Sequence, residues 1–147
     1  IDNELKEDHV DLVIGGPPCQ AYSVAGRARK NMEDDPRNHL YKHYVEFLKR
    51  YKPKMFVFEN VPGILSANNG EYLEKIFNAV KKQGYHLEKQ VLNAKNFNVL
   101  QDRKRVIIIG WRKDLKLQYP KFEDKEVQFE VLKHLFSDLP KLKSGQG

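Results

Sequence analysis

Cys19 is the side chain of this sequence best suited to nucleophilic chemistry. It is the only cysteine among 147 residues, and it follows a short apolar run, two glycines and two prolines. The thiolate form of cysteine is a strong nucleophile, and nearby arginines such as Arg27 and Arg29 would lower the thiol pKa and favour that form. A lone cysteine is also common as a small buried apolar group, so both roles stay open.

Glu59 is the second candidate, because it stands near the end of the otherwise apolar stretch Met55–Val61. In a cleft, partial desolvation would raise its carboxyl pKa and let it donate a proton to a ring nitrogen. On an open surface it would be an ordinary solvated carboxylate. A protease-like pairing with Cys19 is disfavoured, because such sites need a histidine base and none of the five histidines is suitably placed.

Arg103 and Arg105 belong to a basic stretch, Gln101-Asp-Arg-Lys-Arg105, that precedes another apolar run. Being two residues apart, they share a face if a strand begins there, and two guanidiniums on one face suit a carbonyl or phosphate target. The alternative is a solvated basic turn. Further basic residues are candidates for phosphate contacts, namely Arg27, Arg29, Lys30, Lys49, Arg50, Lys52 and Lys54.

The composition favours one globular domain with a polyanionic partner. The chain is 40% hydrophobic and carries a net charge of +6. A single cysteine excludes an internal disulfide and a cysteine-rich zinc module, and it suits a reducing cytosol. His39 and His43 have helical spacing but no evident third ligand, so we expect no metal site. We also find neither a secretion leader nor an apolar stretch of membrane-spanning length.

The elements that must position these side chains alternate between strands and helices. Apolar runs predict strands at Val10–Gly16, Met55–Val61, His86–Leu92 and Arg105–Gly110. Helical spacing predicts helices over Leu40–Tyr51, over Leu73–Val80 before Gly84, and over Val131–Phe136. The polar segment Pro17–Asn38 is long for a compact domain, which is typical of functional loops.

This alternation predicts an α/β layered domain with a largely parallel sheet. Ligands of such sheets lie at the carboxyl ends of the strands. Cys19 follows the first predicted strand and Glu59 ends the second. We therefore expect both groups to project from the same edge of the sheet.

Three motifs, in this order, resemble those of the DNA cytosine-carbon-5 methyltransferases. Gly15-Gly-Pro-Pro-Cys-Gln-Ala-Tyr-Ser-Val-Ala-Gly26 is similar to the nucleophile motif of that family, Glu59-Asn-Val61 to its ENV motif, and Gln101, Arg103 and Arg105 to its QxRxR motif. Arg37 and Leu40 resemble a short block between the first two motifs. Ser137-Asp-Leu-Pro140 resembles the segment that leads into the target-recognition region.

The resemblance implies methyl transfer from S-adenosylmethionine to carbon 5 of a cytosine flipped out of double-stranded DNA. Cys19 would add to carbon 6, Glu59 would hydrogen-bond and protonate N3, and Arg105 would hold O2. Arg103 would support the site electrostatically. It also implies cofactor contacts from Pro18 and Leu40, a loop from Gln20 to Asn38 that closes over DNA, and DNA contacts from Gln20, Ser23, Arg27 and Arg29.

The fold implied by the resemblance is the three-layer, Rossmann-like methyltransferase fold, of which this chain would supply the second part of a mostly parallel sheet with one antiparallel strand. We interpret residues 1–147 as a partial catalytic domain that lacks the glycine-rich cofactor loop and the target-recognition domain. The edge of Val10–Gly16 would then need the missing portions of the enzyme, or another chain, to cover it. The implied location is the cytoplasm of a bacterium, at the nucleoid, or the nucleus of a eukaryote.

Two other functions remain open. A relative that acts on transfer RNA would share the cysteine and ENV motifs, although the residues after Cys19 favour the DNA-modifying branch. A non-catalytic DNA-binding or regulatory relative would keep the fold. The joint presence of Cys19, Glu59 and both arginines favours an enzyme over such a module.

Overall fold

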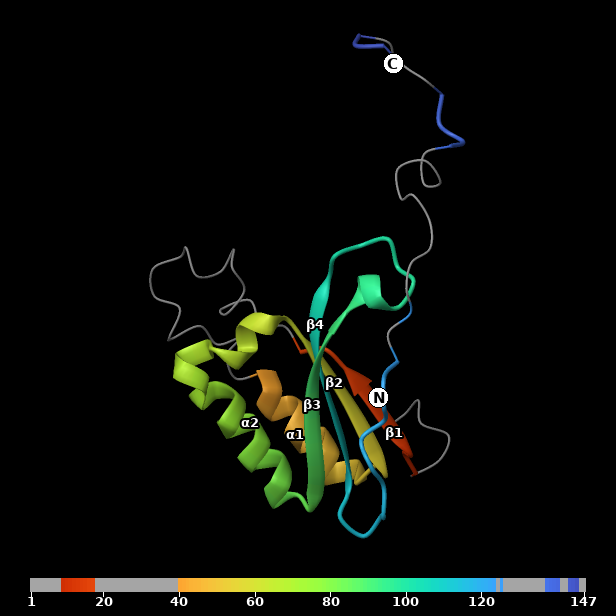
Figure 1. Ribbon diagram of the computed structural model, residues 1–147. Coiled ribbons are helices and arrows are strands. Elements are labelled where there is room, and N and C mark those ends of the chain that lie inside the picture. Colours follow the sequence, from red (N-terminus) through yellow and green to blue (C-terminus); the bar gives the residue numbers. More distant parts are fainter. Residues whose placement is uncertain (1–8, 18–39, 124, 126–136, 141–142, 146–147) are drawn as a thin grey trace.

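The computed structural model describes residues 9–17, 40–123, 125, 137–140 and 143–145 (Figure 1). It contains the strands β1 (Leu12–Gly15), β2 (Met55–Asn60), β3 (Tyr85–Asn93) and β4 (Lys104–Arg112). The helices are α1 (Leu40–Tyr51) and α2 (Glu71–Lys82), with short 3-10 turns η3 (Pro62–Leu65), η4 (Ala67–Gly70) and η5 (Ala94–Asn96).

The four strands form one mixed sheet in the order β1-β2-β4-β3. β1 runs parallel to β2, and Gly15 pairs with Phe58. β4 is antiparallel to both of its neighbours, β2 and β3, so it is the single antiparallel strand among the described residues. The predicted α/β class, with one antiparallel strand in an otherwise parallel arrangement, is confirmed.

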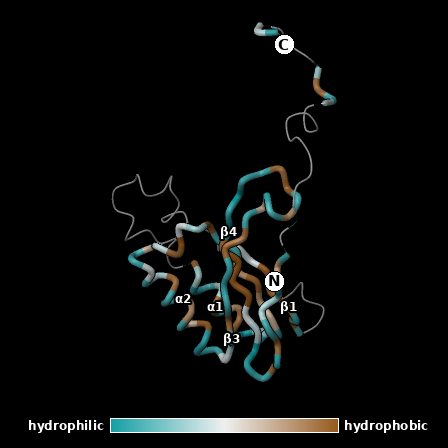
Figure 2. Tube along the Cα trace, viewed as in Figure 1, coloured by the Kyte–Doolittle hydropathy of each residue, from teal (hydrophilic) through white to brown (hydrophobic). Residues whose placement is uncertain are grey.

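Both helices cover one face of this sheet (Figure 1). Phe56, Phe58 and Ile108 project from the strands into a cluster that includes Leu48 of α1 and Ile76 of α2. These side chains are at most 3% exposed, and burial of each large apolar side chain contributes about 1.5–3 kcal/mol. Figure 2 shows hydrophobic residues concentrated along the strands, with hydrophilic residues interspersed along both helices.

Local sequence signals set the ends of the helices. α2 has Glu71 and Glu74 in its first turn and Lys81 and Lys82 in its last, which complements the helix dipole at both ends. It stops before Gly84, whose φ of 87° lies in the left-handed region that glycine favours. α1 ends shortly before the buried Pro53, which cannot donate a helical hydrogen bond.

No described helix covers the opposite face. Ile109 and Trp111 are buried there, and the segment after β4 turns back along this face, where the Tyr119 hydroxyl donates to the Ile107 carbonyl at 3.0 Å. Toward β1 the face is open: the side chain of Leu12 is 48% exposed and that of Ile14 is 71% exposed. β1 pairs with β2 on one side and, within the described ranges, with no strand on the other.

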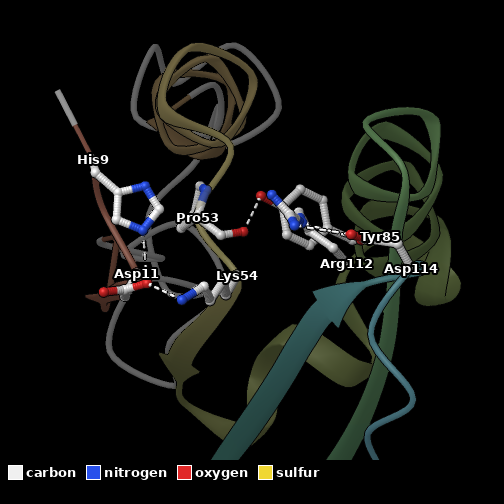
Figure 3. Close-up of polar contacts among 7 residues, drawn as sticks. All are labelled: His9, Asp11, Pro53, Lys54, Tyr85, Arg112 and Asp114. Atoms are coloured by element: carbon white, nitrogen blue, oxygen red, sulfur yellow. Dashed lines mark hydrogen bonds and ion pairs between the residues drawn. The ribbon is translucent and has the colours of Figure 1, made fainter.

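Polar contacts close the end of the sheet where β2 begins (Figure 3). The Tyr85 hydroxyl donates to the Pro53 carbonyl at 2.7 Å, and burial raises the pKa of Tyr85 to about 12. The Asp11 carboxylate contacts Lys54 at 2.8 Å and His9 at 2.9 Å. The hydrogen bond with Lys54, and then that with His9, lowers the pKa of Asp11.

The predicted elements agree with the structure wherever it describes them. The strand predicted at Val10–Gly16 is confirmed but shorter, and the one predicted at Arg105–Gly110 extends at both ends. The predicted helix over Val131–Phe136 and most of the predicted loop Pro17–Asn38 lie outside the described residues. No helix in the described part of the chain is long and apolar enough to cross a membrane.

Candidate active site at the carboxyl edge of the sheet

The carboxyl ends of β1 and β2 meet at one edge of the sheet, the upper end in Figure 1. The strand ends lie as predicted, while Cys19 itself lies outside the described residues. Gly16 and Pro17 continue from β1, and Glu59 and Asn60 are the last two residues of β2. Because β4 is antiparallel to β2, its first residues also lie at this edge, where Val106 pairs with Asn60.

Glu59 and Arg105 form the charged pair of this edge. The Arg105 Nε lies 2.7 Å from Oε1 of Glu59. The side chain of Arg105 is 23% exposed and that of Glu59 is 41% exposed. The pair is therefore accessible from solvent, and its contribution to stability is small. Its value is geometric, because it holds a carboxylate and a guanidinium side by side at the end of β2.

Arg105 keeps hydrogen-bonding capacity beyond this pair. Its Nη1 donates to the carbonyl of Lys104 at 2.8 Å. Its Nη2 makes no hydrogen bond to any described residue. With two nitrogens held by described residues, the third still offers donors that suit a carbonyl oxygen held beside Glu59.

Gly16 makes room for the Glu59 carboxylate. A Cβ at position 16 would lie 2.9 Å from Oε2 of Glu59 and 3.4 Å from the Glu59 carbonyl oxygen. The first distance is shorter than real Cβ contacts, so a side chain at position 16 would displace the carboxylate or the backbone beside it. The second glycine of the predicted nucleophile motif therefore has a steric role.

Asn60 links the two strands that carry the site. It is 5% exposed, its Nδ2 donates to the Pro17 carbonyl at 3.0 Å, and its Oδ1 accepts from the backbone N–H of Val61 at 2.9 Å. The side chain therefore ties the chain that leaves β1 to the end of β2. Pro17 stands two residues before Cys19 in the sequence.

Tyr44 of α1 supports the same edge from the helical face. Its hydroxyl donates to the Val57 carbonyl of β2 at 3.0 Å and lies 3.4 Å from the Val13 carbonyl of β1. Burial, and to a smaller extent Tyr85, raises the pKa of Tyr44 above its usual range. The hydroxyl therefore stays protonated and keeps donating to the strands.

The other described site candidates are Gln101, Arg103 and Leu40. Arg103 and Gln101 are exposed and precede β4, which begins at Lys104. Leu40, the predicted cofactor contact, is the first residue of α1 and is half-buried.

Six predicted site residues lie outside the described residues, namely Pro18, Cys19, Gln20, Ser23, Arg27 and Arg29. Four of the basic residues considered for phosphate contacts cluster at the end of α1 and the start of β2, at the opposite end of the sheet from Glu59. Lys54 is one of these four, and it pairs with Asp11. These four basic residues therefore do not lie beside the Glu59–Arg105 pair.

Three contributors were missed by reasoning from the sequence. Asn60 was recognised only as part of a motif, and Gly16 and Tyr44 were given no role. The sequence holds a partial signal for Gly16, because a second glycine after a strand is unusual. It holds none for the cross-strand contacts of Asn60 and Tyr44, since their partners are backbone groups distant in sequence.

The family model described as C-5 cytosine-specific DNA methylase matches residues 1–145. The chain is 42% identical to Type II methyltransferase M.Bpa9945I of Bacillus paralicheniformis, over 94% of the chain and 34% of that protein. It is 49% identical to Orphan methyltransferase M.SPRI of Bacillus phage SPR, over 77% of the chain and 25% of that protein. The chain thus spans at most about a third of the length of these relatives.

A similar solved structure is that of a putative DNA modification methyltransferase encoded within a prophage of E. coli. It superposes with a TM-score of 0.70 at 32% identity, covering 90% of this chain and 36% of that one. The arrangement of β1, β2, β4 and β3 is therefore shared with a methyltransferase fold.

We expect Asn60→Ala to lower the free energy of unfolding by about 1–3 kcal/mol, because it leaves the Pro17 carbonyl and the Val61 N–H without their partner. Urea denaturation followed by circular dichroism measures the change. Asn78→Ala is the matched control, because Asn78 is exposed on α2. A loss no greater than that of the control would mean that Asn60 does not tie the strands together.

Proposed function

Because the chain belongs to the C-5 cytosine-specific DNA methylase family, we propose that it is the catalytic part of an enzyme that methylates carbon 5 of cytosine in double-stranded DNA. The observation that carries this proposal is the Glu59–Arg105 pair at the carboxyl edge. Asn60 ties this pair to Pro17, two residues before Cys19. Because two residues of chain span at most about 7 Å, we propose that the Cys19 thiol acts at this edge.

In the proposed reaction, the target cytosine leaves the duplex and its ring enters the edge beside Glu59. The Cys19 thiolate adds to carbon 6 while Glu59 hydrogen-bonds N3 and passes a proton to it. The open Nη2 of Arg105 donates to O2. Carbon 5 then takes the methyl group and a solvent base removes the carbon-5 proton. The thiolate leaves as the double bond between carbons 5 and 6 re-forms, and N3 returns its proton to Glu59. Arg103 is exposed one residue before β4, and its proposed part is to contribute positive charge.

S-adenosylmethionine supplies the methyl group in this proposal. Of the two predicted contacts, Leu40 lies half-buried at the start of α1, at the end of the helix nearest the carboxyl edge. That is the edge where ligands of such sheets bind. Leu40 suits one apolar wall of an adenosyl pocket, with Pro18 as the second contact. The predicted DNA contacts of Gln20, Ser23, Arg27 and Arg29 belong to the same proposal.

The open edge of β1 supports the interpretation of residues 1–147 as a partial catalytic domain. Leu12 and Ile14 are exposed on an edge strand that pairs with no other strand among the described residues, and such an edge recruits another strand. We propose that further portions of the same enzyme, or another chain, cover it and supply the glycine-rich cofactor loop and the target-recognition domain. Isothermal titration of the 147-residue chain with S-adenosylmethionine should then show weak binding. Micromolar binding by a monomer would contradict this proposal.

The names of the relatives suggest the biological setting. They include Type II and orphan methyltransferases of bacteria and their phages. We propose DNA methylation in a bacterial cytoplasm, at the nucleoid, as part of a restriction-modification system. Digestion of host DNA by an endonuclease encoded beside the enzyme tests this setting. DNA from cells that lack the methyltransferase should be cut, and equal resistance with and without it would contradict the proposal.

We expect Cys19 to form a covalent adduct with DNA that carries 5-fluorocytosine, in a complete enzyme containing these residues and in the presence of the methyl donor. Fluorine cannot leave carbon 5 as a proton does, so the complex is trapped after methyl transfer. Denaturing electrophoresis detects the adduct, and peptide mass spectrometry locates it. The assignment fails if a Cys19→Ser enzyme still gives a complex that survives denaturation.

Glu59→Gln should lower kcat by about 10²-fold or more and change DNA affinity little, because proton donation matters mainly in the transition state. Single-turnover methylation and a binding titration separate the two effects. Glu46→Gln is the control, since Glu46 is exposed on α1. Turnover of Glu59→Gln close to that of the control would assign Glu59 a structural role.

A further inference from the structure

The four residues directly before and at the start of β4, 101–104, are not anchored by apolar packing. Asn98, Val99 and the whole stretch 101–104 are exposed, and burial begins only at Val106, which is 0% exposed. The hydrophobic core therefore fixes β4 from Val106 onward. Some other interaction must order the backbone that carries Gln101, Arg103 and the start of β4.

Asn93, the last residue of β3, makes that interaction. It is one of two buried polar side chains in the described part of the chain, with 9% of its surface exposed. Its Oδ1 accepts from the backbone N–H of Arg103 at 3.1 Å and from that of Lys95 at 3.3 Å. Its Nδ2 donates to Oδ1 of Asp102 at 2.8 Å. One amide thus joins both arms of the β3–β4 connection.

Asp102 and Lys95 complete the junction. The Lys95 Nζ lies 3.5 Å from Oδ2 of Asp102. The hydrogen bond from Asn93, and then the charge of Lys95, lowers the pKa of Asp102. The backbone N–H of Ala94 also donates to the Arg103 carbonyl at 3.0 Å. The donor of Asn93 faces a carboxylate, and its acceptor faces two N–H groups, so every polar atom of its side chain is used.

We propose that Asn93 is a positioning residue for the methylation reaction, which sets where β4 begins and so directs Arg105 toward Glu59. This inference rests on the proposed function for its catalytic meaning. Asn93 pairs with Lys104 across the ladder, and Leu92 pairs with Arg105. A slip of one residue at this end would exchange the faces of Lys104 and Arg105 and remove the guanidinium from Glu59.

The contact between Asn93 and Asp102 allows a test by exchange of donor and acceptor. Asn93→Asp keeps the acceptor for the two N–H groups but places two carboxylates at hydrogen-bond distance. The double variant Asn93→Asp with Asp102→Asn restores an amide facing a carboxylate and leaves the net charge of the parent. Recovery in the double variant would show that the effect of Asn93→Asp acts through its contact with Asp102, because two carboxylates no longer face each other.

We expect Asn93→Asp to lower kcat by about 10-fold or more through misplacement of Arg105, with an unchanged KM for S-adenosylmethionine, in a complete enzyme containing these residues. The double variant should return to within about 3-fold of the parent kcat. Asn78→Asp, on the exposed side of α2, is the control and should match the parent. Asn93→Asp at the parent kcat, or a double variant no better than the single one, would overturn the proposal.

Amide hydrogen exchange at Arg103 separates this inference from the proposed function. The amide should exchange faster in Asn93→Asp and regain protection in the double variant. A parent enzyme without methyl transfer would refute the proposed function, and the exchange pattern would still decide whether Asn93 orders the strand end. Equal exchange in all three proteins would show that it does not.

Discussion

The parallel pairing of β1 with β2 is the constraint on which the candidate site depends. It brings the ends of two strands that are far apart in sequence to one edge, so that Gly16 lies against Glu59 and Pro17 accepts a hydrogen bond from Asn60. Tyr44 fixes the same pair of strands from the helical face. Cys19 follows β1 in the sequence, Glu59 is near the end of β2, and Arg105 belongs to β4 beside it.

The antiparallel direction of β4 is the second requirement. Glu59 is near the carboxyl end of β2, and Arg105 is near the amino end of β4. Two such positions become neighbours only if the strands run in opposite directions. A fully parallel sheet would place the start of β4 at the other end of β2, roughly 17–20 Å away for a strand of ordinary length. The single departure from a parallel sheet thus assembles the charged pair.

Much of this arrangement could be predicted from the sequence, because it depends on local patterns. Apolar runs predicted β1, β2 and β4, and helical spacing predicted α1, which ends shortly before Pro53. The contact that orders the start of β4 could not be predicted, because the Asn93 side chain accepts from the Arg103 N–H across the β3–β4 connection. The contacts of Asn60 and Tyr44 could not be predicted either, because their partners are backbone carbonyl groups, which every residue carries.

The close approach of Gly16 to Glu59 also bears on how such chains can diverge. Every replacement for glycine adds at least a Cβ, and at this position the added atom would meet the carboxylate oxygen. A side chain at position 16 would therefore push the Glu59 carboxylate, which is the end of a flexible side chain, into another pose. A relative that carries a side chain there should accordingly present its glutamate to the ring in a different orientation.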